Sequence, residues 1–463
     1  MKNKNNMLYI IFISAVSALG GILFGYDTGV VSGTITKVAT QFNLDSIQQG
    51  WYVSSALLGA IIGVASAGLL SDFFGRKRTL IISAILFTIL GIGCALANSF
   101  IELVSYRIIG GTAIGIVSIV SPLYISEMSV PKFRGRLVSL YQLAITVGFL
   151  GSYIVNYFLM NFGQSVILES PLPHKIFNTE IWRGMLGMEA VPAILFLVVL
   201  FYIPESPRWL ILRHKEKSAL SILQRIYNDK HDATQEFNKI KGVTATQEKS
   251  EWKSLFQPGI FKVVVIGLSI AMLGQFMGIN AVMYYGPTIF QDSGLSDGDS
   301  LFYQVLVGLV NVLTTVLALL IIDKVGRKKL VYYGVSSIFI SLLAIAFYFE
   351  FGKTLAIPSL LLLILFLFYV FSCAISICAV IWVLLSELYP LKVRGVAMSI
   401  AGFSLWIGSF LVGQLTPWML QELSPAGTFV LFSLMCIPYM LIVWKFVPET
   451  MGKSLEEIET NWN

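Results

Sequence analysis

The sequence predicts an all-α membrane protein whose twelve transmembrane helices form two six-helix halves. Of the 463 residues, 56% are hydrophobic and only 13% are charged, whereas a soluble globular chain carries roughly 25% charged residues. A transmembrane helix needs roughly 20 apolar residues, so this chain has apolar material for about twelve of them. The apolar segments also fall into two sets around one polar stretch. These proportions argue against a soluble enzyme, a nucleic-acid-binding protein and a disordered scaffold.

Six apolar segments separated by short polar turns make up the first half. The N-terminal apolar segment comes after a short stretch whose charged residues are Lys2 and Lys4. The segment contains Asp27 and lacks a convincing small-residue cleavage site. We therefore interpret it as the first span and not as a removed signal peptide. The expected spans are 7–33, 47–71, 78–97, 100–128, 134–160 and 182–203.

The only long polar stretch, 204–258, separates this half from the second, and its helical periodicity predicts short surface helices. The second half has expected spans at 259–291, 299–323, 328–351, 357–389, 393–422 and 424–447. The predicted domains are an N-terminal half over 1–203, cytoplasmic linker helices over 204–258, and a C-terminal half with a cytoplasmic tail over 259–463.

The basic residues predict the orientation of these spans. With the N-terminus in the cytoplasm, 27 of the 32 Lys and Arg residues fall on the cytoplasmic side. The outer side receives only Lys37, Lys175, Arg183 and Lys353. Because cytoplasmic loops are enriched in Lys and Arg, we expect both termini in the cytoplasm of a multi-pass protein of the cytoplasmic membrane. The net charge of +6 then reflects topology, and we expect no nucleic-acid partner.

The two halves repeat the same short motifs. Gly75-Arg76-Lys77 returns as Gly326-Arg327-Lys328, offset by 251 residues. Glu127 with Arg134-Gly135 returns as Glu387 with Arg394-Gly395, and Pro204-Glu205-Ser206 returns as Pro448-Glu449-Thr450, with offsets of 260 and 244 residues. Three motifs in one order at nearly equal offsets indicate a duplicated six-helix unit. This pattern is typical of transporters that bind substrate between two halves.

The repeated motifs combine acids and arginines beside cytoplasmic helix ends. We hypothesise that they form a charge network between the halves, which latches the inner side when the halves close there. The alternative is a set of ordinary surface pairs, each contributing only about 0–1 kcal/mol. The candidate cytoplasmic gate comprises Asp72, Arg76, Glu127, Arg134, Glu205, Arg208, Asp323, Arg327, Glu387, Arg394 and Glu449.

Nearly all charges lie in loops or near span ends, as Glu102 does, and the clear exceptions are Asp27, Arg107 and Glu189. A charge in mid-membrane costs several kcal/mol and marks a functional-site candidate. At about 1.5 Å per residue, all three fall in the outer part of the first half. All three histidines lie in loops, so a coupled proton needs a carboxylate. We hypothesise that Asp27 takes up an external proton, which weakens its pairing with Arg107 and lets Arg107 pair with Glu189. The alternative is a static buried triad.

Amide and aromatic side chains on the spans are the candidate binding groups. Amides both donate and accept hydrogen bonds, which suits hydroxyl groups, and aromatic faces suit the C–H face of a sugar ring. Hydrogen bonding between helices is the alternative for any single amide. The candidates are Gln142, Gln275, Asn280, Tyr284, Tyr285, Asn311, Trp382 and Trp406.

Several of these motifs together resemble the sugar porter family of the major facilitator superfamily over nearly the whole chain. The most telling are Phe24-Gly25-Tyr26-Asp27, Gly75-Arg76-Lys77, Pro204-Glu205-Ser206-Pro207-Arg208 and Gly278-Ile279-Asn280. Arg134-Gly135-Arg136 and Pro448-Glu449-Thr450 belong to the same set. The combination of Asp27, Arg107 and Glu189 resembles bacterial proton-coupled members that carry xylose or glucose.

The resemblance implies a major facilitator fold and sugar contacts at Gln142, Gln275, Asn280, Asn311 and Trp382, with Trp406 nearby. Phe24, at the head of its motif, completes the candidate binding set. Three single residues and one pair depart from the family pattern: Phe149, Gly274, Leu405 and the pair Cys378-Ala379. The first three remove hydrogen-bonding groups or add bulk, which leaves the sugar open. The last replaces a Gly-Pro pair and predicts a less kinked helix.

We therefore expect a proton-coupled symporter that imports a monosaccharide such as xylose or glucose by alternating access. A passive sugar facilitator and a non-transporting sugar receptor are the alternatives. We expect no enzymatic activity, since no nucleophile–base pair stands out. The four cysteines lie in apolar runs without metal-ligand spacing, so we expect no metal or cofactor. The expected partners are a monosaccharide, a proton and the lipid bilayer, with the chain acting as a monomer.

Overall fold

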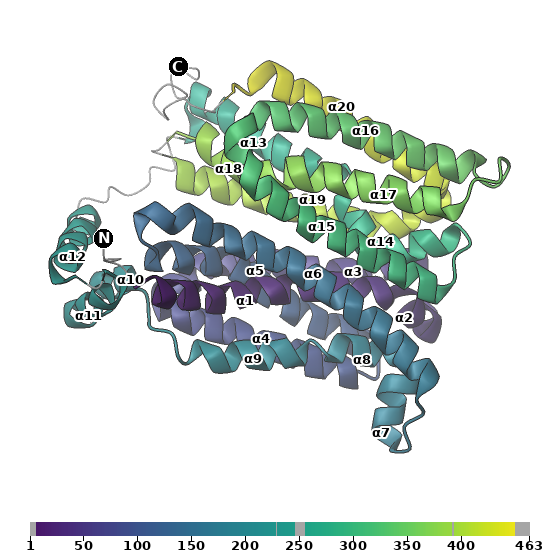
Figure 1. The fold of residues 1–463 in the computed structure, drawn as a ribbon, viewed down its shortest axis with the longest axis horizontal. Helices are drawn as coiled ribbons and strands as arrows, with labels where there is room; N and C mark the ends of the chain where they lie inside the picture. Colours follow the sequence, from purple (N-terminus) through teal and green to yellow (C-terminus); the bar gives the residue numbers. More distant parts are fainter. Residues whose placement is uncertain (1–5, 228, 246–254, 391–392, 450–463) are drawn as a thin grey trace. The chain divides into compact units, whose positions relative to one another are not determined.

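A computed structural model describes residues 6–227, 229–245, 255–390 and 393–449, and the regular structure within these ranges is helical throughout (Figure 1). It contains twelve segments that are long and apolar enough to cross a membrane, which confirms the predicted all-α, twelve-span class. The first six are formed by α1 (Met7–Val30), α3 (Ser46–Phe74), α4 (Arg76–Leu96), α5 (Phe100–Met128), α6 (Arg134–Ser165), and α8 (Ile181–Gly187) with α9 (Ala190–Leu200).

The other six spans follow the polar linker. They are formed by α13 (Pro258–Phe276) with α14 (Ile279–Asp292), α15 (Asp297–Val325), α16 (Arg327–Phe351), α17 (Ser359–Cys373) with α18 (Ala379–Leu388), α19 (Arg394–Glu422) and α20 (Ser424–Phe446). Each predicted span has its counterpart, and the boundaries shift by only a few residues.

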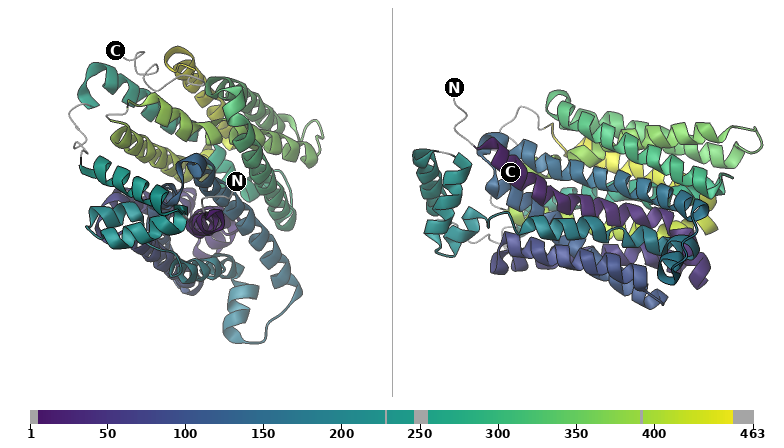
Figure 2. Two further views of the ribbon diagram at one scale, coloured as in Figure 1. Left: turned by 60° about the vertical axis from the view of Figure 1, so that its left-hand side comes forward. Right: turned by 60° about the horizontal axis from the view of Figure 1, so that its bottom comes forward.

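Short polar helices connect the spans. The linker forms α10 (Pro207–Leu212), α11 (Glu216–Tyr227) and α12 (Lys230–Ala245), as its helical periodicity predicts, while part of it, 246–254, lies outside the described residues. These three helices lie together at the end of the first-half bundle where α1 begins (Figures 1 and 2). Two more short helices, α2 (Ile35–Phe42) and α7 (Pro171–His174), lie between spans.

Capping side chains fix where several spans begin. The Ser99 hydroxyl accepts a hydrogen bond from the Glu102 amide at the start of α5, and the Ser296 hydroxyl does the same for Asp299 at the start of α15. These bonds satisfy amide donors that the first turn of a helix leaves unpaired. At the starts of α4 and α16 the preceding residues are Gly75 and Gly326, each with φ of 96°, a backbone conformation that favours glycine.

Two of the second-half spans are interrupted. Gly278, with φ of 87°, separates α13 from α14. The sequence predicts a straighter helix around Cys378-Ala379, but a π-helical segment, Ala374–Cys378, separates α17 from α18. Such π turns are a usual cause of helix kinks. The wider turn packs against Gly334 of α16, where a Cβ would lie 2.0 Å from the Ser376 Cβ.

The described chain divides into two compact units by packing. Unit 1 comprises residues up to Val30, Leu58–Val155 and Val166–Lys249, and in it α4 packs along α5 and α9, while α1 packs along α5. Unit 2 comprises the second-half helices together with Val31–Leu57 and Asn156–Ser165. Its main contacts join α16 to α20 and α13 to α19.

Candidate functional site

The three predicted intramembrane charges all lie in unit 1. Asp27 is on α1, Arg107 is on α5, and Glu189 directly precedes α9. All three are buried, and Arg107 Nη1 lies 3.4 Å from Asp27 Oδ1. Glu189 is close enough to interact electrostatically with both. Neither Glu189 oxygen, nor Asp27 Oδ2, accepts a hydrogen bond from the described residues. The cluster therefore has one formed pair and a second buried carboxylate with open acceptor capacity.

Close helix packing positions Asp27 within this cluster. A Cβ on Gly25 would lie 1.9 Å from the Ile145 carbonyl oxygen of α6, so only glycine allows α1 to approach so closely. The neighbouring Tyr26 hydroxyl donates to the Met185 carbonyl of α8 at 3.3 Å. The Phe24-Gly25-Tyr26-Asp27 motif thus fixes α1 against two other helices and directs Asp27 into the bundle.

Three polar side chains form a closed hydrogen-bond triangle in unit 2. Asn280 Nδ2 donates to Gln275 Oε1 at 2.8 Å and to Ser409 Oγ at 3.2 Å, and Ser409 Oγ donates to Gln275 Oε1 at 3.0 Å. The break at Gly278 brings Gln275 and Asn280 together from α13 and α14. The structure thus joins two predicted binding residues and adds Ser409, which sequence reasoning missed. Its signal was its position three residues after Trp406, about one helical turn away.

The other predicted binding residues differ in exposure. Within unit 2, Tyr284, Tyr285, Asn311 and Trp406 are buried, whereas Trp382 is 40% exposed. Tyr285 donates its hydroxyl hydrogen to the Gly413 carbonyl at 2.6 Å, and the Trp382 ring lies beside Gly402. Phe24 and Gln142 belong to unit 1, and both are half-buried. Among the second-half candidates, the hydrogen bond described here joins Gln275 and Asn280.

A second missed residue, Gln304, supports the helix that carries Asn280 and Tyr285. Pro287 lies inside α14 and has no N–H to donate to the Met283 carbonyl. The buried Gln304 Nε2 instead donates to the Met283 and Val282 carbonyls, each at 3.3 Å. Its side chain fits because residue 286 is glycine, where a Cβ would lie 2.0 Å from Gln304 Oε1.

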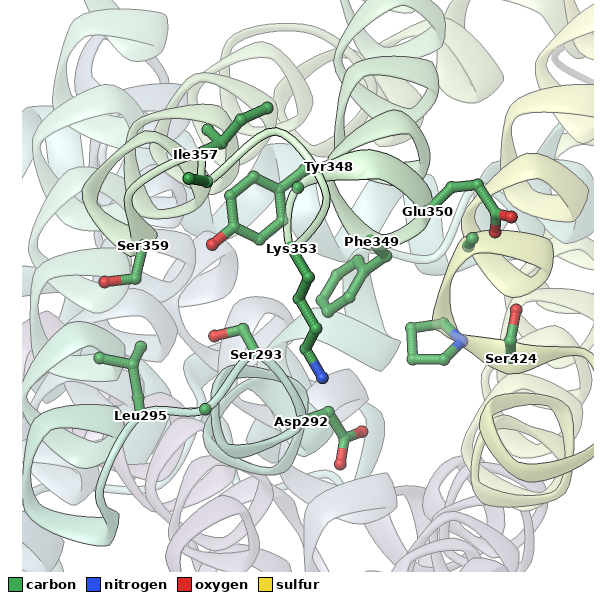
Figure 3. Close-up of a pocket in the computed structure, with 15 residues that line it drawn as sticks. Asp292, Ser293, Leu295, Tyr348, Phe349, Glu350, Lys353, Ile357, Ser359 and Ser424 are labelled. Atoms are coloured by element: carbon green, nitrogen blue, oxygen red, sulfur yellow. The ribbon is translucent and has the colours of Figure 1, made fainter.

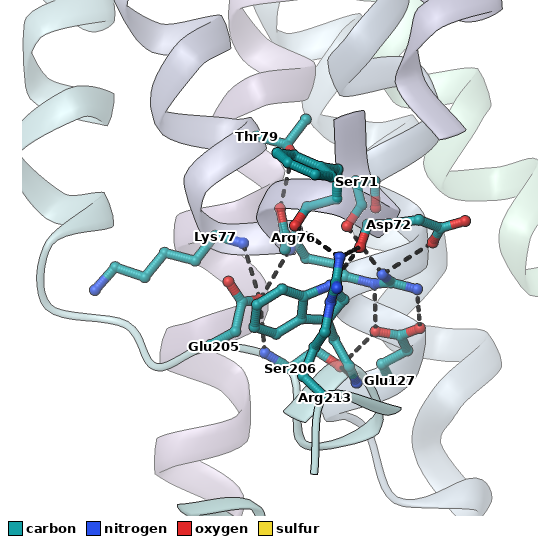
Figure 4. A network of polar contacts seen from close by, with 12 residues as sticks. Ser71, Asp72, Arg76, Lys77, Thr79, Glu127, Glu205, Ser206 and Arg213 are labelled. Carbon is teal, nitrogen blue, oxygen red and sulfur yellow. Dashed lines mark hydrogen bonds and ion pairs between the residues drawn. The ribbon is translucent and has the colours of Figure 1, made fainter. Parts of the chain in front are cut away.

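The motif residues at the start of α4 form a dense polar network in unit 1 (Figure 4). One oxygen of Glu205, Oε1, accepts from the backbone N–H groups of Arg76, Lys77 and Ser206 at 2.8–3.1 Å. The Arg76 guanidinium makes a two-point contact with Glu127, at 3.0 and 3.1 Å. It also pairs with Asp72 at 3.2 Å.

The Glu205 carboxyl has a shifted pKa in this network. Burial raises its pKa above the ordinary value of 4.5, although the backbone donors and the Arg76 charge act in the opposite direction. Because it accepts from the Arg76 and Lys77 backbone N–H groups, Glu205 also caps the N-terminus of α4, the end of a helix that favours negative charge.

Unit 2 repeats the network at the start of α16. Glu449 accepts from the backbone N–H groups of Arg327 and Lys328 at 3.1 and 3.2 Å. Arg327 Nη2 lies 3.1 Å from Glu387 Oε1, and Arg394 donates to the Tyr389 carbonyl. Arg134 and Arg208 are exposed, and the Asp323 side chain lies outside the described part of the structure. These hydrogen bonds and ion pairs join motif residues of the same unit, so a latch between the halves stays a prediction.

A cavity of about 460 Å³ lies in unit 2 where α14, α16, α17 and α20 begin or end (Figure 3). Asp292, Glu350 and Lys353 supply its charged lining, and Tyr348 and Phe349 supply aromatic rings. None of the predicted binding residues lines it. The cavity is therefore a different site from the polar triangle of Gln275, Asn280 and Ser409.

Comparisons with known proteins agree over the length of the chain. The family model described as "Sugar (and other) transporter" matches residues 13–462. The chain is 37% identical over 461 residues to the arabinose-proton symporter of Bacillus subtilis (strain 168), with 99% of this chain and 96% of the relative covered. It is 38% identical over 497 residues to the D-xylose-proton symporter of Escherichia coli (strain K12), with 100% and 97% covered.

Solved structures give the same result. The inward open conformation of the xylose transporter XylE from E. coli matches with a TM-score of 0.85 at 37% identity, covering 98% of this chain and 100% of that one. The proton:xylose symporter XylE bound to 6-bromo-6-deoxy-D-glucose matches with a TM-score of 0.79 at 37% identity, covering 99% and 100%.

Proposed function

Because this chain belongs to the sugar porter family of the major facilitator superfamily, we propose that it is a proton-coupled symporter that imports a monosaccharide by alternating access. The observation that carries the proposal is the buried Asp27–Arg107 pair beside Glu189, whose oxygens accept no hydrogen bond from the described residues. Relatives named as arabinose-proton and D-xylose-proton symporters support the same assignment.

Proton coupling follows from competition between two acids for one cation. When Asp27 takes up an external proton, its charge is lost and its attraction for Arg107 falls. Arg107 then pairs with Glu189, whose oxygens have open acceptor capacity. This exchange keeps the buried cation paired in both states, which matters because an unpaired buried charge is costly. A proton that crosses about 100 mV supplies roughly 2.3 kcal/mol for this step.

Sugar binding uses the amide and aromatic groups of both halves. Gln275, Asn280 and Ser409 already satisfy one another in the structure. A sugar hydroxyl both donates and accepts, so it can replace one side of the triangle without leaving a buried group unpaired. Trp382 and Trp406 offer flat apolar faces, and Asn311, Tyr284, Tyr285, Phe24 and Gln142 complete the proposed site. The mixture suits a neutral pentose or hexose.

The cytoplasmic charge clusters serve as the inner gate in this scheme. The N-terminal half over 1–203 and the C-terminal half over 259–463 move relative to each other about the linker over 204–258. The motif acids and arginines change partners as the inner side opens and closes. The chain works as a monomer in the cytoplasmic membrane, with both termini in the cytoplasm.

Uptake by purified protein in liposomes tests this function. We expect saturable uptake of one of xylose, arabinose or glucose, and accumulation above the external concentration only when the outside is more acidic. Equilibration without accumulation at any pH gradient would instead identify a passive facilitator. Specific sugar binding without uptake would identify a receptor, and neither binding nor uptake of any sugar in the panel would overturn the assignment.

A further inference from the structure

Unit 2 contains segments of the first half as well as the second. Val31–Leu57 includes α2 and the first part of α3, and it packs with α14 and α19 of the second half. The predicted topology places these segments, and the C-terminal part of α19, toward the outer side. In that topology, the contacts between these segments lie on the outer side.

One side chain, Gln414 of α19, connects to α3 through both ends of its amide. Ser54 Oγ donates to Gln414 Oε1 at 2.7 Å, and Gln414 Nε2 donates to the Ile47 carbonyl at 2.9 Å. Between them, Gly50 lies so close that a Cβ would be 2.0 Å from the Gln414 carbonyl oxygen. Residues 47, 50 and 54 follow helical spacing, so one face of α3 forms the whole contact.

The same turn of α19 is also hydrogen-bonded to α14. The Gly413 carbonyl accepts the Tyr285 hydroxyl hydrogen at 2.6 Å, and a Cβ on Gly413 would lie 3.0 Å from Leu57 Cδ1 of α3. Gly413 and Gln414 thus lie between the outer part of α3 and the helix that carries Asn280 of the polar triangle.

Two other contacts join first-half and second-half segments within unit 2. Lys37 and Asp297 pair at 3.5 Å, but the Asp297 side chain is 53% exposed, and exposed pairs contribute little. The Tyr157 and Phe302 rings lie with their centroids 5.7 Å apart, an aromatic contact. The Gln414 side chain is half-buried: its bond to the fully buried Ser54 is shielded from solvent, whereas its bond to the Ile47 carbonyl is exposed.

We propose that Gln414 is a positioning residue that holds the outer side closed, and that both of its hydrogen bonds to α3 must break before sugar enters from outside. This inference rests on the alternating-access function proposed above. It predicts that loss of the amide shifts the protein toward the outward-open state without removing any group that contacts sugar.

A cysteine reporter in the closed contact tests this directly. Val53 is 3% exposed and faces Gly413, so Val53→Cys should react with a membrane-impermeant thiol reagent from outside only when α3 leaves α19. In Gln414→Met, which keeps the length but removes both hydrogen bonds, we expect labelling to rise roughly 2- to 13-fold, the effect of losing one typical hydrogen bond, because the bond to Ser54 is part-buried whereas the bond to Ile47 is exposed. Ser54→Ala removes one of them, and we expect a smaller rise.

A matched amide provides the control. Gln49 lies on the same helix, and its side-chain amide donates to the nearby Leu44 carbonyl at 3.1 Å, so Gln49→Met should leave labelling unchanged. The four native cysteines are measured alone as background, and the midpoint of thermal unfolding is followed for each variant. Unchanged labelling in both Gln414→Met and Ser54→Ala, or an equal rise in Gln49→Met, would overturn the proposal.

The labelling experiment is independent of sugar uptake. If the wild type transports no sugar but Gln414→Met still raises labelling at residue 53, the proposed function fails and the closure stands. If the wild type transports sugar and labelling does not change, the function stands and the role of Gln414 is wrong.

Discussion

In the proposed mechanism, ion coupling depends on Asp27, which is buried and pairs with the buried Arg107. Asn has nearly the same shape but carries no charge and takes up no proton at physiological pH. We therefore expect Asp27→Asn to lose accumulation of sugar against a gradient while it retains exchange of sugar across the membrane. Accumulation and exchange are measured in the same liposomes.

An exposed acid gives the control for this change. Asp45 caps the start of α3 and accepts from the Gln48 amide at 2.8 Å, and Asn caps a helix about as well as Asp. Asp45→Asn should therefore accumulate sugar as the wild type does. If accumulation survives in Asp27→Asn, the triad is a static buried structure and coupling lies elsewhere.

Glu205 gives a pH-dependent prediction at the same scale. Burial raises its pKa in the folded protein above the ordinary value, so the folded state binds this proton more tightly than the unfolded state does. The contribution of Glu205 to stability is therefore largest below the unfolded pKa and is lost as pH rises through the folded pKa. Gln keeps an oxygen to cap α4 but has no such proton.

We expect the melting midpoint of the wild type, relative to that of Glu205→Gln, to fall as pH rises from about 4.5, the ordinary pKa of Glu. Thermal unfolding of the purified protein between acidic and neutral pH measures this difference. A difference that grows in favour of the wild type with rising pH would show that the backbone donors and Arg76 outweigh burial.

Sequence reasoning was most effective for residues whose charge is energetically costly inside the membrane. Asp27, Arg107 and Glu189 could be predicted as a set because charges inside apolar spans are few and expensive. Ser409, Gln304 and Gln414 could not, because a lone hydroxyl or amide on a span costs little and is common. Their partners come from helices distant in sequence, such as Ser54 for Gln414, and only packing decides them.

At the scale of the element, the approach of α1 to α6 depends on glycine. A Cβ on Gly25 meets a backbone carbonyl, which cannot move without moving its helix. We expect Gly25→Ala to destabilise the fold by about 1–3 kcal/mol, the usual range for overpacking. The loss is measured as a lower melting midpoint, and a displaced Asp27 should also reduce sugar accumulation.

Gly151 on α6 is the matched control for this prediction. A Cβ there meets nothing within 4 Å, so Gly151→Ala should leave stability unchanged or raise it by about 0.5–1 kcal/mol through helix propensity. Equal losses in both variants would mean that glycine acts through backbone flexibility in these helices and not through close packing.

The spans themselves could be read from apolar length, which is why all twelve were predicted. The interruption at Ala374–Cys378 could not, because a π turn has no reliable sequence signal and here depends on space beside Gly334. The break before α14 was more visible, since Gly278 lies between two candidate binding residues. A break in a membrane helix therefore depends both on its own residues, as at Gly278, and on the space that a neighbouring helix leaves, as at Gly334.

For the whole molecule, the repeated motifs correspond to repeated chemistry. Glu205 caps α4 and Glu449 caps α16. The first residue of each of these helices, Arg76 or Arg327, pairs with an acid of its own unit. The repeat in sequence predicted the duplicated unit, but it could not decide whether those acids and arginines pair within a half or across halves. In each unit, the equivalent glutamate accepts hydrogen bonds from the backbone N–H groups at the start of the equivalent helix. The repeated motif is therefore explained by helix capping within each unit.

The orientation of the whole chain is the last prediction, and it depends on the uneven distribution of positive charge. Lys and Arg are retained in the cytoplasm during insertion, so the linker that carries Lys217 should lie inside and the loop that carries Glu169 outside. Both residues are exposed, and the native cysteines are buried or half-buried. We expect an impermeant thiol reagent to label Glu169→Cys in intact cells but Lys217→Cys only after permeabilisation. The reverse pattern would invert the topology, and it would then place the Gln414 contact and the Asp27 cluster toward the cytoplasm, so that neither an external proton nor outer closure could act as proposed.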